Sequence, residues 1–152
     1  MTLPTHIMAG LIVGKVTGNY PVAIITSVVF DLDHFFFYYT RDLIFRPVKV
    51  FKKALRKKIF IKGRRGIFHS VFTWIMVSAL FMLINFPLGV TVSASYLVHL
   101  ILDVLDDASF YPFYPLKVLN LRGPITYFSF SEVVFLAIIT LAYYLTFNLI
   151  VL

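Results

Sequence analysis

The chain's histidines and aspartates have the residue types and the spacing of ligands for one metal site. His99 and Asp103 are four residues apart, which places both side chains on one face of a helix. Asp31 and His34 are three residues apart and can also converge. Because the chain has no cysteine, a transition metal would need imidazole and carboxylate ligands. These residues therefore indicate a divalent metal, the kind of ion that activates water for hydrolysis.

Asp33 limits how this group can be arranged. In a regular helix its side chain points roughly opposite to that of Asp31, so both could face one metal only if the helix breaks there. The ligands are therefore predicted more firmly as a group than residue by residue.

The elements that position these residues belong in a membrane. Of the 152 residues 60% are apolar and only 14% are charged, with a mean hydropathy of +0.89. A soluble domain carries about 25% charged residues, and a lipid-facing surface explains the difference. We predict a single membrane-embedded helical domain over residues 1–152.

Five apolar segments are expected to form its helices. Segments 66–86 and 133–152 are free of formal charge and have about the 20 residues that cross a bilayer as a helix. Segments 20–40 and 88–105 carry ionisable residues near one end. Segment 3–16 is short, roughly 20 Å as a helix, and either tilts or is re-entrant. Since backbone groups in lipid must pair internally, we predict an all-α integral membrane bundle of about five helices.

The basic segment 41–65 sets the expected topology, because it holds 11 of the 14 Lys and Arg residues. Loops rich in these residues stay cytoplasmic. If all five helices span, the N-terminus is inside and the C-terminus outside. Segment 41–65 itself is either an amphipathic helix on anionic lipid or a solvated loop. Only its charge would support nucleic acid binding, which we do not expect.

On this topology all four histidines and six of the seven acidic residues fall in the cytoplasmic third of the bundle. A lone histidine at a helix end is commonly an interfacial anchor, and a lone aspartate is commonly a cap. Ionisable groups inside a membrane cost a few kcal/mol each, about 3 on insertion scales, and usually mark function. Several of them at one depth, from different helices, favour a metal site in the bundle core.

Four short motifs lie in order within residues 4–120. They are Thr5-His6, Asp31-Leu32-Asp33-His34, Arg65-Gly66-Ile67-Phe68-His69-Ser70 and His99-Leu100-Ile101-Leu102-Asp103. Their order and spacing resemble the LexA-regulated, membrane-bound, metal-dependent hydrolase family (YdjM-like). Phe30 stands where that family's P-D-x-D-H motif has proline. The resemblance implies a membrane-bound hydrolase with a divalent metal.

We expect hydrolysis of a lipid-borne phosphoester or ester at the cytoplasmic face of the inner membrane. The cofactor would be zinc, as one or two ions, with manganese or iron as alternatives. The predicted metal ligands are His6, Asp33, His34, His69, His99 and Asp103.

The predicted catalytic residues are Asp31, Asp33, Ser70 and Arg65. One of the two aspartates would act as general base. Arg65 and Ser70 would hold a phosphate at the start of a helix, where backbone amides favour anions.

Two other functions use the same residues: a non-catalytic protein that binds or transports a divalent metal, and a scaffold with a polar clasp between helices. A transport path would need polar residues further toward the outer side, where segments 66–86 and 133–152 offer little besides small hydroxyl groups. The chain has no H-E-x-x-H, G-x-S-x-G or P-loop motif, which argues against zinc protease, serine hydrolase and nucleotide hydrolase functions.

Overall fold

The computed structural model describes residues 1–31 and 66–148. Within these ranges the chain forms five α-helices and one short 3₁₀ turn, with two isolated β-bridges and no strand. The elements are α1 (Leu3–Thr17), α2 (Tyr20–Val29), η2 (Ile67–His69), α5 (Val71–Ile84), α6 (Phe86–Leu105) and α7 (Phe130–Asn148). The all-helical class predicted from the sequence is confirmed for the described part of the chain.

The residues at two junctions between helices explain why the helices end and begin there. Gly18 ends α1 with φ at 74°, a left-handed conformation that glycine adopts without a Cβ clash. The side chain of Asn19 then accepts a hydrogen bond from the Val22 amide at the start of α2. Asn85 does the same for α6, at 3.0 Å from the Leu88 amide. Both tight hairpins therefore follow from local sequence.

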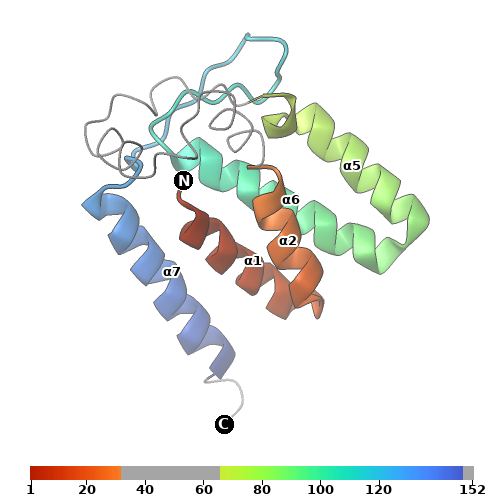
Figure 1. The fold of residues 1–152 in the computed structure, drawn as a ribbon, viewed down its shortest axis with the longest axis horizontal. Helices are drawn as coiled ribbons and strands as arrows, with labels where there is room; N and C mark the ends of the chain where they lie inside the picture. The colour runs from red at the N-terminus through yellow and green to blue at the C-terminus, as the bar shows by residue number, and fades with distance from the viewer. Residues whose placement is uncertain (32–65, 149–152) are drawn as a thin grey trace, which may run out of the picture.

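The helices run alternately up and down, so that α7 ends at the opposite end of the bundle from the N-terminus (Figure 1). Helix α1 packs against α2, α6 and α7, while α6 also packs against α2 and α5. Gly10 lets α1 and α2 approach closely, because a Cβ there would lie 2.9 Å from the Cα of Ile24. Helix α6 is thus the central element, and α1 and α2 lie against it.

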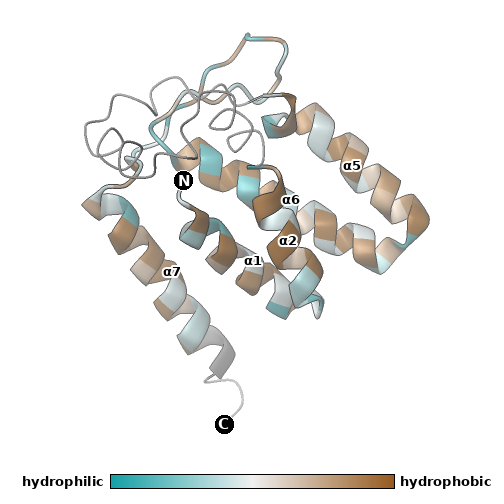
Figure 2. Ribbon diagram, in the orientation of Figure 1, coloured by the Kyte–Doolittle hydropathy of each residue, from teal (hydrophilic) through white to brown (hydrophobic). Residues whose placement is uncertain are grey.

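The interior of the bundle mixes polar and apolar side chains, whereas its outer surface exposes many large apolar side chains. Ser78 is the buried residue of α5, whereas Leu83 on the same helix is 87% exposed, and Phe130 at the start of α7 is 81% exposed. Figure 2 shows apolar residues predominating on the outer helices and hydrophilic residues near the end of α6. Water would penalise so much exposed apolar surface, and such a pattern is typical of helices that face lipid.

Helix lengths differ from those expected. In the described ranges, α6 is the one helix both long and apolar enough to cross a membrane, whereas Tyr20–Val29, Val71–Ile84 and Phe130–Leu145 are shorter apolar helices. The prediction of one continuous helix over 20–40 is wrong, because α2 ends at Val29. Phe30 and Asp31 form a turn in which the Asp31 amide bonds to the Val28 carbonyl at 3.0 Å. The predicted basic segment 41–65 lies outside the described residues.

The segment between α6 and α7 is irregular and folds back over the end of α6. Asp106 pairs with Ile125 and Phe110 with Leu121 in isolated bridges. Gly123 makes the contact with α6 possible, since a Cβ there would lie 2.1 Å from the backbone of Leu105. This segment therefore closes one end of the bundle.

Candidate metal centre

That same end of the bundle gathers most of the ionisable residues described. The first turn of α1, the end of α2, the 3₁₀ turn η2, the last turn of α6 and the first turn of α7 all meet there (Figure 1). They bring five side chains into one cluster: His6, Asp31, His69, His99 and Asp103. The predicted gathering of histidines and acids at one end of the helices is present in the structure.

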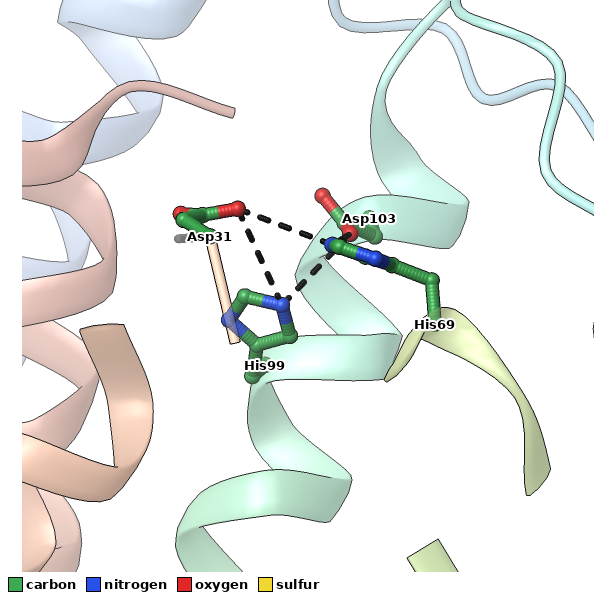
Figure 3. Close-up of side chains that lie close together, drawn as sticks. All are labelled: Asp31, His69, His99 and Asp103. Carbon is green, nitrogen blue, oxygen red and sulfur yellow. Dashed lines mark ion pairs between the residues drawn. The ribbon is translucent and has the colours of Figure 1, made fainter. Parts of the chain in front are cut away.

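Four of these side chains are arranged as a metal-binding group. One ligand atom from each of Asp31, His69, His99 and Asp103 lies within 4.8 Å of the others. His69 Nε2 is 3.6 Å from Asp31 Oδ1 and 3.2 Å from Asp103 Oδ2. His99 Nε2 is 3.9 Å and 3.7 Å from the same two oxygen atoms. Figure 3 shows the four side chains pointing toward one another from α2, η2 and α6.

His6 approaches the same two carboxylates from α1. Its Nε2 is 3.6 Å from Asp31 Oδ2 and 3.9 Å from Asp103 Oδ1. Its ring centroid is 4.4 Å from that of His99. The residue is fully buried, and neither ring nitrogen has a hydrogen-bond partner within the part of the chain that the structure describes. A buried imidazole without such a partner costs free energy, about 1–3 kcal/mol, unless another ligand satisfies it.

These spacings test whether the residues fit a metal. Two ligand atoms about 2.1 Å from a tetrahedral zinc ion lie about 3.4 Å apart. The six imidazole–carboxylate distances run from 3.2 to 3.9 Å. Five of the six are longer than a direct N–H···O hydrogen bond, which is about 2.7–3.2 Å. The spacing and the nitrogen and oxygen donors therefore suit a divalent cation between the side chains.

The backbone of α2 orients His99. Its Nδ1 lies 2.9 Å from the carbonyl oxygen of Ser27. A carbonyl can only accept, so Nδ1 carries the proton and the Nε2 lone pair is left toward the centre. Metal-bound histidines are commonly held in this way by a hydrogen bond from the other ring nitrogen.

His69 is held by the turn in which it lies. The hydroxyl of Tyr96 donates to the Phe68 carbonyl, and the hydroxyl of Thr73 donates to the Ile67 carbonyl at 2.6 Å. Tyr96 is fully buried and its ring stacks on Phe30, with centroids 3.5 Å apart. Helix α6 thus supplies two side chains of the centre and also fixes the turn that supplies a third.

Asp31 is the most open of the five, with 21% of its side chain exposed. Burial raises the pKa of this carboxyl, but the nearby imidazole rings of His69, His6 and His99 lower it more. Its pKa therefore lies below the usual value, and Asp31 is a carboxylate at neutral pH.

Three further groups at this end were not predicted as site residues. The Met1 ammonium lies 2.8 Å from Asp106 Oδ2 and 3.4 Å from Asp103 Oδ1. Glu132 of α7 is buried and accepts hydrogen bonds from the Thr2 and Phe128 amides. These contacts tie the start of α1, which carries His6, to α6 and α7. Asp106 and Glu132 could have been noticed in the sequence as acidic residues next to apolar segments. Their partners could not, because these depend on how the helices pack.

The remaining predicted residues are placed differently. Ser70 is the N-cap of α5: its hydroxyl accepts from the Phe72 amide and donates to the Tyr114 carbonyl at 2.9 Å. Its predicted role in holding a phosphate stays a prediction. The predicted roles of Asp33, His34 and Arg65 fall outside the described residues.

A comparison with known proteins gives one match. The model of a family described as YdjM inner membrane protein matches residues 1–151, nearly the whole chain. No curated protein and no solved structure matches the chain. The family match confirms the resemblance carried by the four sequence motifs.

Proposed function

The chain belongs to the YdjM inner membrane protein family, and from this membership and the metal centre we propose that it is a metal-dependent hydrolase of the inner membrane. The observation that carries the proposal is the convergence of three buried imidazoles on the same two carboxylates. We propose that it acts at the cytoplasmic interface on a lipid-borne ester, with a phosphoester favoured.

The described residues would have two roles, binding the metal and orienting its ligands. Asp31, His69, His99 and Asp103 would hold a divalent metal, for which zinc suits the donor set. When bound, such an ion supplies Lewis acidity, which activates water at neutral pH and stabilises developing negative charge. Ser27 and Tyr96 keep the imidazoles oriented.

As long as one of its two carboxylate oxygen atoms is not bound to metal, Asp31 is the best candidate among the described residues for accepting a proton. Its side chain is partly exposed, whereas that of Asp103 is buried. A carboxylate that stays ionised at neutral pH can accept a proton from an attacking water, provided it lies within reach of it. Asp33, predicted for the same role, is the alternative.

The surroundings support a lipid substrate. The outer faces of α5 and α7 are apolar and exposed, as lipid-facing helices require. The segment beside the centre also exposes apolar side chains, among them Phe113, Leu116 and Val118. A substrate held in the bilayer would reach the centre from this end, with its polar headgroup at the depth of the carboxylates.

The test compares metal content and hydrolysis in the same purified preparations. We expect detergent-purified protein to contain a divalent metal by elemental analysis and to hydrolyse a phospholipid or a chromogenic phosphoester. Asp103→Asn should lose both. Asp107→Asn is the matched control, because Asp107 is an exposed acid four residues further on. Wild-type protein without metal, or Asp103→Asn protein with full metal content and activity, would refute the proposal.

The deep burial of the imidazoles favours a second candidate, a divalent-metal-binding or transport protein without hydrolysis. The two functions share their ligands and differ in their products. Metal bound without turnover of any ester, together with metal uptake into proteoliposomes, would favour the second candidate over the first.

A further inference from the structure

We propose that the centre holds two divalent metal ions, the second bound by His6 and by the oxygen atoms of Asp31 and Asp103 that face away from His69 and His99. This inference rests on the proposed metal-dependent function and deepens it. It assigns His6 to a position of its own, separate from the group formed by the other four side chains.

The two oxygen atoms of each carboxylate face different histidines. Asp31 presents Oδ1 to His69 and His99, at 3.6 and 3.9 Å, and Oδ2 to His6, at 3.6 Å. Asp103 presents Oδ2 to His69 and His99, at 3.2 and 3.7 Å, and Oδ1 to His6, at 3.9 Å. In both carboxylates one oxygen atom faces His69 and His99 and the other faces His6, although Asp31 lies in the turn after α2 and Asp103 lies in α6.

This division is expected of carboxylates that bridge two cations. A single ion would need one oxygen from each carboxylate, and the other two oxygen atoms would then face solvent or hydrogen-bond donors. Here both face the Nε2 atom of His6, whose fully buried ring has no hydrogen-bond partner among the described residues, and Asp103 Oδ1 also faces the Met1 ammonium. Neutral imidazole has one donor and one acceptor nitrogen, and a cation placed between Nε2 and the two oxygen atoms would use that acceptor.

The Met1 ammonium does not prevent Asp103 Oδ1 from binding the second metal ion. It also approaches Asp103 Oδ1, at 3.4 Å, but its closer partner is Asp106 Oδ2 at 2.8 Å. The closer contact of the ammonium is therefore with Asp106, and a carboxylate oxygen such as Asp103 Oδ1 has two lone pairs, enough to contact both the ammonium and a metal.

The two positions would differ in openness. The first has four protein ligands, the number of a closed tetrahedral site, whereas the second has three from the described residues. A site with three protein ligands keeps a place for water or substrate. Paired ions about 3.5–4 Å apart can act together on the attacking and leaving oxygen atoms of a phosphoester. The second position is therefore the one at which we expect substrate to bind.

The experiment measures metal stoichiometry and the coupling between ions, without relying on activity. Wild-type, His6→Ala and Asp107→Asn proteins are purified in detergent, loaded with Mn²⁺, desalted and measured by elemental analysis and electron paramagnetic resonance. Wild-type and Asp107→Asn proteins should hold two equivalents and show an exchange-coupled signal. His6→Ala should hold one equivalent and show the six-line spectrum of an isolated ion. His6→Gln, checked by circular dichroism, provides a second variant if His6→Ala does not fold.

The outcomes separate this inference from the proposed function. One equivalent in the wild type, with an uncoupled spectrum unchanged by His6→Ala, would overturn the second position while leaving a metal-dependent function intact. No metal in the wild type would overturn both. A folded His6 variant that loses both equivalents would contradict the assignment of His6 to a separate position.

Discussion

The Nδ1 atom of His99 donates a hydrogen bond to the carbonyl oxygen of Ser27, 72 residues earlier in the chain, at 2.9 Å. A side chain of the central helix is thus oriented by the backbone of α2. The position of that backbone depends in turn on the close approach of α1 to α2 at Gly10. The geometry of the metal centre is therefore coupled to a helix crossing outside it.

Substitution of Gly10 should disturb the centre through this crossing. In Gly10→Ala the new Cβ would lie 2.9 Å from the Cα of Ile24, and backbone cannot rotate away from it. Overpacking of this kind costs about 1–3 kcal/mol. We expect a lower melting temperature and weaker metal binding, measured by thermal circular dichroism and by competition with a chelator. Val16→Ala, at an exposed position of the same helix, should change neither.

Removal of the Tyr96 hydroxyl should loosen the turn that carries His69. Tyr96→Phe keeps the ring that stacks on Phe30 but leaves the Phe68 carbonyl without this donor. We expect a loss of about 1–3 kcal/mol in stability from the unsatisfied carbonyl. Removing a group that orients a metal ligand typically weakens metal affinity by about 10–100-fold. We expect Tyr96→Phe to weaken metal binding within that range. Unchanged affinity in a chelator titration would show that η2 does not need this bond.

Ser70 offers a test between its observed and its predicted roles. Its hydroxyl caps α5 and bonds to the segment between α6 and α7. Ser70→Ala should therefore cost about 0.5–2 kcal/mol in stability while metal content stays the same. If Ser70 also holds a phosphate, KM for a phosphoester should rise, and Ser70→Thr should restore it. A changed stability with an unchanged KM would leave the cap as its role.

Asp31 should give the metal-free protein an acid-sensitive contribution to stability. Its pKa in the folded state lies below the unfolded value of about 3.9. The contribution is therefore fully present above about pH 4 and is lost as the pH falls through the folded pKa. The melting-temperature difference between wild type and Asp31→Asn should be constant from about pH 5 to 7 and shrink below about pH 4. In Asp107→Asn, at an exposed acid, the difference should stay small throughout.

Local sequence was sufficient for the helical class and for two of the turns between helices. The turns at Gly18 and Asn85 could be predicted because a left-handed glycine and an asparagine cap act on their nearest neighbours. The prediction of a helix through Asp31 failed, since apolar composition continues past Val29 while the backbone turns there. The apolar composition of a segment does not show at which residue its helical backbone hydrogen bonds end.

For the candidate metal centre, the sequence by itself determined the donor chemistry, the family and the gathering of the ligands at one end of the bundle. Residue type sets which atoms can bind a metal, and alternating helix directions set which end they reach. Only the tertiary structure decided that His6 faces one pair of carboxylate oxygen atoms while His69 and His99 face the other. That division depends on how α1, α2 and α6 are rotated and spaced against one another. Such rotations arise from contacts between residues far apart in the chain, which spacing along the sequence does not specify.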